Sequence, residues 1–426
     1  MKDAISGEEP GESYKLGGVF MDSLITAAAR ALSAGNPLTA LKAVALRDEA
    51  PALALRGIAM AQLGNLTSAR ELLRNAARAF GPAQPLGRAR CLLAEAEIAL
   101  VSRDLGQSSQ TFDAARALLE SSGDRTNAAH AGYLEARRLL LLGRLDEAEA
   151  LLDQLDAAAL PHPSQVGHEL VVAGIAIRRI KTKPAKFALE RARWAAEKAQ
   201  IPAFSAEVER AAQAFEAPAG RFISKGTERL LQLDEVEALL ASDRLIVDAC
   251  RNVVRAGSTI VPLTTRPVLL ALLRALVESW PEDVPRERLL ERAFRARQAD
   301  ESHRARLRVE IARLREAIKP LAALSATRQG FVLQPHTAGG VGVLAPPVEG
   351  DHAEVLALLA DGEAWSSSAL ALALNVSPRT VQRALEALAQ DGKVEAFGRG
   401  RARRWISSSV PGFPTSLLLP VASVSG

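Results

Sequence analysis

Two helix patterns meet in the segment Leu370-Ala-Leu-Ala-Leu-Asn-Val-Ser-Pro-Arg-Thr-Val-Gln-Arg-Ala-Leu-Glu-Ala-Leu388. The first helix is expected over residues 366–374, and a three-residue turn follows it. Ser377 is a favourable N-cap and Pro378 is favoured at the first helical position, so a second helix is predicted to begin there. Gly392 is a strong stop signal for that helix. The segment therefore predicts a helix-turn-helix.

The second helix of this segment has an apolar stripe of Val381, Leu385 and Leu388 that must face a core. A short helix is expected before the segment, over 353–359, and two strands after it, over 394–397 and 402–406. The hairpin between the strands reads Gly398-Arg399-Gly400-Arg401.

This arrangement resembles the helix-turn-helix and wing of bacterial winged-helix repressors. The resemblance implies a recognition helix in a DNA groove and a wing on phosphates. An alternative is that this unit binds only protein, as some winged helices do. The candidate DNA-binding residues are Arg379, Thr380, Gln382 and Arg383 on the helix, with Arg399, Arg401, Arg403 and Arg404 in the wing.

A second group of elements is expected further toward the N-terminus. Alternating β-branched residues predict short antiparallel strands, and Pro281 and Pro320 punctuate the helical patterns that follow. The expected order is three strands at 245–249, 252–255 and 259–261, a helix from Pro267, a short helix over 285–294, a third helix over about 300–319, and a hairpin around Gly330 over 325–333.

The third of these helices has two distinct faces. Its core stripe consists of Leu307, Ile311, Leu314 and Ile318. The opposite face carries Ser302, Arg306, Val309 and Arg313, and guanidinium groups there suit guanine edges or phosphate. The flanking residues Arg304, Arg308 and Arg315 are better placed for the DNA backbone. The alternative is a solvated helix in which Glu310 and Glu316 form local ion pairs.

The order of these elements, with Leu263-Thr264, Arg286-Glu287-Arg288-Leu289, Val309-Glu310-Ile311-Ala312-Arg313-Leu314-Arg315 and Arg328-Gln329-Gly330-Phe331, resembles the OmpR/PhoB-type winged-helix DNA-binding domain. The resemblance implies that the third helix lies in the major groove. It also implies that the hairpin, with Arg328, reaches the adjacent minor groove. A receiver domain would normally precede such a domain, but helical repeats occupy that place here, so control by aspartyl phosphorylation is not expected.

The N-terminal half is rich in Ala and Leu at helical spacing, with short turns about every 30 to 40 residues. The turns are Gly35-Asn36, Gly64-Asn65, Arg103-Asp104, Gly143-Arg144 and Lys181-Thr182. Small residues such as Gly57, Ala61 and Ala69 let paired helices approach closely. This pattern resembles tetratricopeptide-type repeats, which implies a superhelix. Such a superhelix serves either as a surface for a peptide or protein, or as an oligomerisation or spacer module.

Composition narrows the class of protein. Aromatic residues make up 4% of the chain, which argues against a β-sandwich or barrel, and two cysteines cannot build a disulfide framework. No apolar run approaches the length of a membrane span, and no export signal is recognisable. The net charge of +4 is compatible with DNA binding. His168-Glu169 lacks the second histidine of a zincin motif, and no nucleophile and base are paired.

The sequence thus predicts a mainly α protein with a tetratricopeptide-like α-solenoid followed by two winged-helix domains. The expected parts are a disordered N-terminus over 1–21, repeats over 22–215, an OmpR/PhoB-like domain over 221–335, a linker over 336–350, a second winged helix over 351–407 and a disordered tail over 408–426. The expected function is a cytoplasmic, non-enzymatic, sequence-specific transcription regulator without cofactor or metal. Its partners would be double-stranded DNA, a protein or peptide on the repeats, and a possible second protomer. The alternative is an adaptor whose winged helices dock partner proteins.

Overall fold

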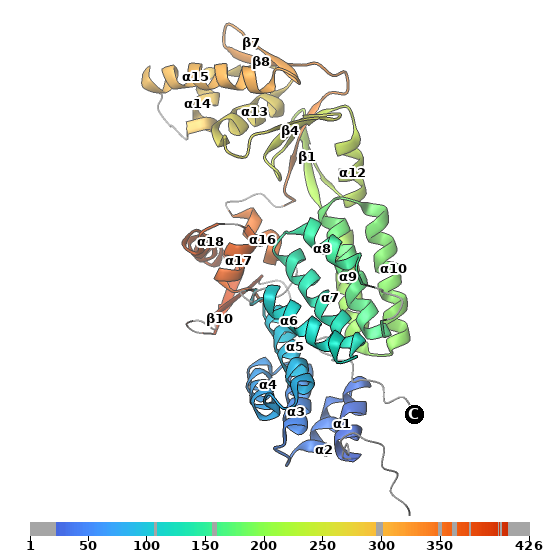
Figure 1. Ribbon diagram of the computed structural model, residues 1–426. Coiled ribbons are helices and arrows are strands. Elements are labelled where there is room, and N and C mark those ends of the chain that lie inside the picture. The colour runs from blue at the N-terminus through green and yellow to red at the C-terminus, as the bar shows by residue number, and fades with distance from the viewer. Residues whose placement is uncertain are drawn as a thin grey trace, which may run out of the picture.

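The chain divides into three parts in the computed structural model, which describes residues 23–105, 109–155, 160–294, 301–347, 352–359, 364–374, 376–398, 400 and 403–407. We call residues 23–216 the helical domain, residues 220–347 the middle domain and residues 352–407 the C-terminal domain. Figure 1 shows the middle domain at one end of the helical domain and the C-terminal domain beside α5 to α8. The expected disordered termini lie outside the described residues.

The helical domain consists of consecutive helices joined by short turns, as the sequence predicts. The helices are α1 (Ser23–Ser33), α2 (Pro37–Val44), α3 (Ala50–Gln62), α4 (Leu66–Phe80), α5 (Pro85–Val101), α6 (Ser109–Ser121), α7 (Arg125–Leu141), α8 (Leu145–Leu152), α9 (His162–Arg178), α10 (Thr182–Ala199) and α11 (Pro202–Glu216).

The predicted turns all lie between helices and share one backbone conformation. Gly35, Gly64 and Gly143 have φ values of 72°, 83° and 76°, and the equivalent residues Arg103 and Ile180 have φ values of 51° and 55°. After each of them, the next amide donates to a carbonyl five residues earlier, closing the preceding helix. The left-handed conformation suits glycine, so the two non-glycine turns carry a local cost.

Close packing of helix pairs depends on small residues. A Cβ atom at Gly57 in α3 would lie 2.8 Å from Cγ of Leu73 in α4, so only glycine fits at this crossing. Ala61 and Ala69 are fully buried in the same cluster. The expectation that small residues permit close helix approach is therefore confirmed at this pair.

In its described residues, the middle domain combines two sheets with four helices. One sheet has the strand order β2-β1-β9-β3-β4-β5 and the other the order β6-β8-β7. The elements are β1 (Gly220–Ser224), β2 (Thr227–Leu231), α12 (Leu233–Ala241), β3 (Leu245–Asp248), β4 (Val253–Ala256), β5 (Thr259–Pro262), α13 (Pro267–Ser279), β6 (Val284–Pro285), α14 (Arg286–Phe294), α15 (Glu301–Ile318), β7 (Ala322–Ala326), β8 (Gly330–Pro335) and β9 (Val341–Ala345). The predicted strands, three helices and hairpin are all present.

The expected linker over 336–350 is wrong at residues 341–345. These residues form β9, a fully buried strand that is antiparallel to β1 and parallel to β3. Gly342 is required there, because a Cβ atom would lie 2.2 Å from Cε2 of Phe222. The chain therefore returns from the hairpin into the first sheet before it leaves the domain, and the middle domain extends beyond residue 335.

The C-terminal domain contains α16 (Ala353–Leu359), α17 (Ser367–Leu374), α18 (Pro378–Gln390), β10 (Val394–Phe397) and β11 (Arg404–Ser407). β10 and β11 pair antiparallel, and Trp365 forms an additional bridge to Trp405 on β11. The predicted helix-turn-helix and strand pair are therefore present.

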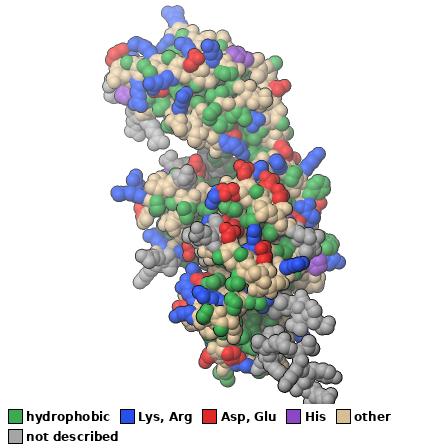
Figure 2. All heavy atoms as spheres, in the orientation of Figure 1, with side chains coloured by type: hydrophobic (Ala, Val, Ile, Leu, Met, Phe, Trp, Pro, Cys, Tyr) green, Lys and Arg blue, Asp and Glu red, His purple; other side chains and the backbone are tan. Residues whose placement is uncertain are grey.

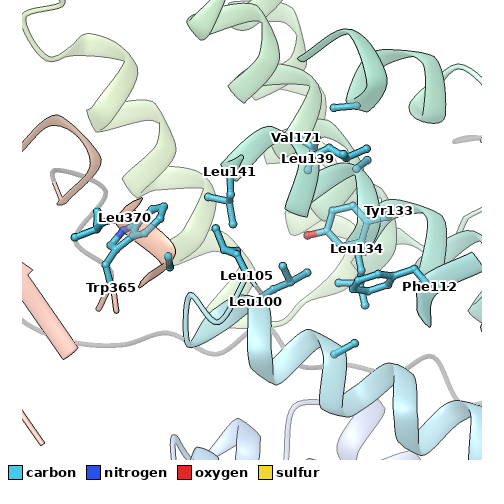
Figure 3. Packing of buried hydrophobic residues seen from close by; sticks show 14 of the residues in the cluster. Leu100, Leu105, Phe112, Tyr133, Leu134, Leu139, Leu141, Val171, Trp365 and Leu370 are labelled. Atoms are coloured by element: carbon cyan, nitrogen blue, oxygen red, sulfur yellow. The ribbon is translucent and has the colours of Figure 1, made fainter. Parts of the chain in front are cut away.

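The helical and C-terminal domains share one hydrophobic cluster. It includes Leu100, Leu105 and Leu141 of the helical domain together with Trp365 and Leu370 of the C-terminal domain. Figure 3 shows Trp365 and Leu370 facing Leu141, with Leu105 and Leu100 close by. Trp365 is only 1% exposed, so this contact removes a large apolar side chain from water.

Candidate nucleic-acid interface

Helix α18 is fixed at its start by a side-chain cap. The hydroxyl Oγ of Ser377 accepts a hydrogen bond from the amide of Thr380 at 3.2 Å. Pro378 follows at the first helical position, as predicted. The buried side of the helix consists of Val381, Ala384, Leu385 and Leu388. These contacts fix which residues of α18 point outward.

The outward face of α18 carries the four predicted contact residues, and all four are exposed: Arg379, Thr380, Gln382 and Arg383. Two of them have hydrogen bonds within the helix. Oγ1 of Thr380 lies 2.8 Å from Oγ of Ser377, and Nε2 of Gln382 donates to Oε1 of Glu386 at 3.2 Å. A polar helix face of this kind offers donors and acceptors to base edges.

The wing places its arginines differently. Arg403 is exposed, with its guanidinium carbon 4.4 Å from the ring centroid of Trp405. Arg404 instead turns toward the helical domain, where Nε donates to the carbonyl of Ser102 at 3.3 Å. The prediction that Arg404 contacts phosphate is therefore wrong in this structure. Its side chain contacts the helical domain instead. Arg399 and Arg401 lie outside the described residues.

Helix α15 has the two faces that its sequence predicts. Leu307, Ile311, Leu314 and Ile318 are buried, and Ser302, Arg306, Val309 and Arg313 are exposed. Figure 2 shows Lys and Arg side chains gathered over the middle domain and at the outer edge of the C-terminal domain. Both candidate helices therefore present cationic side chains to solvent.

The arginines of α15 also have partners within the domain. Nη1 of Arg313 lies 2.9 Å from Oε1 of Glu310, and Arg304 and Arg308 each approach Glu301 at 3.6 Å. The guanidinium carbon of Arg306 lies 4.7 Å from the ring centroid of Phe294. The ion pair with Glu310 that the alternative of a solvated helix predicts is therefore present. The side chains of Arg304, Arg308 and Arg313 are nevertheless more than half exposed, so these arginines can exchange their carboxylate partners for other anions.

Arg315 and the hairpin are held together by hydrogen bonds. Nε of Arg315 donates to the carbonyl of Leu324 at 2.8 Å, and its guanidinium lies over the ring of Phe331. Arg286 donates to the carbonyls of Arg328 and Thr327, both at 3.1 Å. Arg328 itself is exposed in the turn. Arg315 thus holds β7 in place in this structure. The sequence had predicted only a contact of Arg315 with the DNA backbone.

Other chemistry does not assemble in the described ranges. They contain no group of three or more His, Cys, Asp or Glu side chains placed to hold a metal. Their helices are also too short or too polar to cross a bilayer. His168 and Glu169 are buried, and Glu169 forms an ion pair with Arg191 at 2.7 Å. The carboxylate of Glu169 therefore has a structural role in the helical domain.

Comparison with known protein families supports the assignment of the C-terminal domain. A family model described as a winged helix-turn helix matches residues 352–410. This segment corresponds to α16 through β11, so the match supports a winged helix-turn-helix fold for the C-terminal domain, and such a fold suggests DNA binding. Comparisons of the chain with curated proteins and with solved structures give no match.

Proposed function

We propose that this chain is a sequence-specific DNA-binding transcription regulator in which α18 reads base edges. The observation that carries the proposal is the exposed face of α18, with Arg379, Gln382 and Arg383, inside a domain that matches a winged helix-turn-helix model. Arginine suits guanine and glutamine suits adenine in the major groove. In this proposal the exposed Arg403 of the wing contacts phosphate.

The middle domain is the second DNA-binding module of this proposal. Its three helices and hairpin follow the order that the OmpR/PhoB resemblance implies, with α15 as recognition helix and the turn at Arg328 as wing. The exposed arginines of α15 would exchange Glu301 and Glu310 for phosphate or base edges. This exchange costs part of the binding energy, so we expect the middle domain to contribute less affinity than its charge suggests.

In this proposal the helical domain binds a protein or peptide partner or a second protomer. The recurrent turn conformation at Gly35, Gly64, Arg103, Gly143 and Ile180 supports tetratricopeptide-like pairs, which present surfaces to a protein, a peptide or a second protomer. No cofactor, metal or catalytic step forms part of the proposal, and the cytoplasm is the proposed location.

Selection of bound sites from a random DNA pool tests this proposal on the full chain. We expect an enriched sequence, bound at physiological salt far more tightly than random DNA, with log Kd depending linearly on log salt. Arg383→Ala should relax the preference at one base position, whereas Arg193→Ala, on the surface of α10, should leave binding unchanged. A full chain that is folded but has no preferred sequence would contradict sequence-specific regulation.

The ion pairs on α15 also support a second candidate function, a protein-interaction adaptor. A helix face whose arginines are already paired with Glu301 and Glu310 offers less free charge to DNA. In that case binding of duplex DNA would be weak and would disappear at physiological salt. Tight binding that persists at physiological salt would exclude the adaptor.

A further inference from the structure

Two large aromatic side chains are exposed on the surface of α10. Phe187 is 59% exposed and Trp194 is 50% exposed. They are seven residues apart, so two helical turns place them on the same side of the helix, about 10 Å from each other along its axis. Figure 1 shows α10 on the side of the helical domain away from the C-terminal domain. Exposed aromatic side chains that lie together mark a contact surface for another molecule.

The ring of Trp194 is held in one orientation by two neighbours. The ring of His162, at the start of α9, meets it edge to face, with centroids 5.3 Å apart and ring planes at 89°. Nζ of Lys198 lies 5.9 Å from the centroid of the Trp194 ring. These contacts leave half of the residue in water. An aromatic ring that is already ordered loses little conformational entropy when a partner binds.

The same helix and its N-cap contain a large share of the lysines of the chain. Four of the ten lysines lie between residues 181 and 198, and all four are exposed: Lys181, Lys183, Lys186 and Lys198. Among the described residues, no carboxylate oxygen lies within 4.0 Å of their Nζ atoms, and Lys183 interacts with Glu237 only at longer range. The lysines beside the two rings are therefore available to an acidic partner.

The other charged residues of α10 leave this positive charge in place. Arg191 pairs with Glu169 at 2.7 Å and Arg193 approaches Glu209 at 3.5 Å, so carboxylates of the neighbouring helices neutralise both arginines. The acidic residues of α10 itself are two, at positions 190 and 197, and both are exposed. The four lysines thus outnumber the acidic side chains of the same segment by two to one.

Two of the lysines stand at the ends of the aromatic pair. Lys183 precedes Phe187 by four residues and Lys198 follows Trp194 by four, so these four side chains follow one line along the helix. Glu190 is the acidic residue between the two rings. A line of this kind, with cations outside and rings inside, is complementary to a segment that has carboxylates around two apolar side chains.

We propose that this surface of α10, with Lys183, Phe187, Trp194 and Lys198, binds an acidic amphipathic segment of a partner protein. Apolar side chains of the segment cover the two rings, and its carboxylates meet the lysines. A symmetric contact with a second copy of the chain is less favourable, because it places lysines against lysines. The inference rests on the interaction role proposed for the helical domain, and it is independent of α18 and of DNA.

Anisotropy titrations of a labelled model peptide with the full chain test the site. The probe consists of Glu and Ala with two Leu residues two helical turns apart, and the control peptide has Lys in place of Glu. We expect the acidic peptide to bind with a Kd on the order of 100 μM or tighter, and its binding to weaken as the salt concentration rises. The basic control peptide should not bind.

Substitutions of exposed residues assign the binding to α10. Trp194→Ala should weaken binding of the acidic peptide at least about tenfold, as the loss of a central aromatic contact does. The double variant Lys183→Gln with Lys198→Gln should weaken it about threefold, the effect of exposed ion pairs. Glu190→Gln should have the opposite sign and strengthen binding, because it removes a negative charge between the rings.

Lys42→Gln and Leu46→Ala are the matched controls in the first helix pair, where Lys42 is exposed and Leu46 is 98% exposed. Neither should change binding, and circular dichroism checks the fold of each variant. Absence of binding by the acidic peptide would overturn the proposal, as would an equal loss in the controls or weaker binding by Glu190→Gln.

Two further probes separate the acidic segment from other anionic partners. Vesicles of phosphatidylcholine and phosphatidylserine, or duplex DNA, that require Lys183 and Lys198 while the acidic peptide does not bind would assign the surface to lipid or nucleic acid and refute the proposal. Selection of DNA sites is a separate measurement. A chain that has no preferred DNA sequence but binds the acidic peptide contradicts the proposed regulator and supports the α10 surface.

Discussion

The guanidinium carbon of Arg103 lies 5.4 Å from the ring centroid of Trp365, so a turn of the helical domain holds a residue that is 262 positions later in the sequence. Arg103 has a left-handed backbone, with φ of 51°, at a turn position where Gly35, Gly64 and Gly143 have glycine. Its side chain is nevertheless buried, and Nη1 donates to the carbonyl of Leu100 at 3.2 Å. We infer that the cation–π contact offsets the backbone cost of about 1 to 2 kcal/mol.

Arg103→Gly should therefore separate the two effects. Glycine relieves the backbone at the turn, so we expect the helical domain to keep or gain stability, while the C-terminal domain loses its contact and becomes more accessible to protease. Limited proteolysis and hydrogen exchange of α17 and α18 measure this difference. Trp365→Ala should weaken the same docking, with a larger loss of about 3 to 5 kcal/mol from the buried ring.

A double-mutant cycle joins these variants. If Arg103 and Trp365 act through each other, the double variant should lose less docking free energy than the sum of the single losses. Additive losses would show that the pair does not couple the domains. Trp194→Ala is the matched control, because Trp194 is 50% exposed on α10 and its removal should change the docking little.

Arg315 provides a second prediction, because it donates to the carbonyl of Leu324 and covers the ring of Phe331. Arg315→Ala should destabilise the middle domain by about 1.5 to 3 kcal/mol, the range for a hydrogen bond that involves a charged group. Arg308→Ala should leave stability unchanged, since the Arg308 side chain is 74% exposed, and should lower the salt slope of DNA binding by about one phosphate contact. The opposite assignment, an unchanged stability in Arg315→Ala with a reduced salt slope, would make Arg315 the phosphate contact. Denaturant unfolding and anisotropy titrations measure the two effects.

Periodicity predicted helices in all three domains where a helix buries one apolar stripe, as α15 does with Leu307 and Ile311. The strand at residues 341–345 could not be recognised from its composition. Val341-Gly-Val-Leu-Ala follows two glycines and resembles a linker, and its strand identity depends on pairing with β1 and β3, which are about 100 residues away in sequence. Strands β1 and β2 and helix α12 were not expected either.

The candidate site was also predictable only where it depends on local sequence. The exposed face of α18 follows from helical spacing alone, because the buried residues fix it. The direction of Arg404 could not be predicted, since its acceptor is the carbonyl of Ser102, 302 residues earlier. Local patterns therefore predict which residues face outward, whereas contacts between domains depend on the tertiary arrangement.

Gly330 at the start of β8 provides a third prediction. A Cβ atom there would lie 1.8 Å from the carbonyl oxygen of Val284, which cannot move without breaking the pairing of β6 with β8. Gly330→Ala should therefore destabilise the middle domain by at least about 2 kcal/mol. Gly392→Ala is the graded control: φ is 68° but nothing lies within 4 Å, so only the left-handed backbone should cost about 1 to 2 kcal/mol. Rapid hydrogen exchange confined to the hairpin would support the clash, and a stable Gly330→Ala protein would contradict it.

Glu169 gives a pH-dependent prediction in the helical domain. Burial acts to raise its pKa, but the hydrogen bond from Arg191 at 2.7 Å and the proximity of His168 outweigh burial and hold the pKa below the ordinary value of 4.5. A carboxyl whose pKa is depressed by folding stabilises the protein above about pH 4.5, and this contribution disappears as the pH falls through the folded-state pKa. Glu169→Gln should therefore lower stability at pH 7 by about 1 kcal/mol, since the exposed Arg191 is screened by solvent, and the difference should vanish at strongly acidic pH. Glu190→Gln, at an exposed position on the same helix as Arg191, is the control. Urea unfolding at a series of pH values measures the effect, and a difference between Glu169→Gln and the parent protein that stays constant with pH would refute the role of the ionised carboxylate.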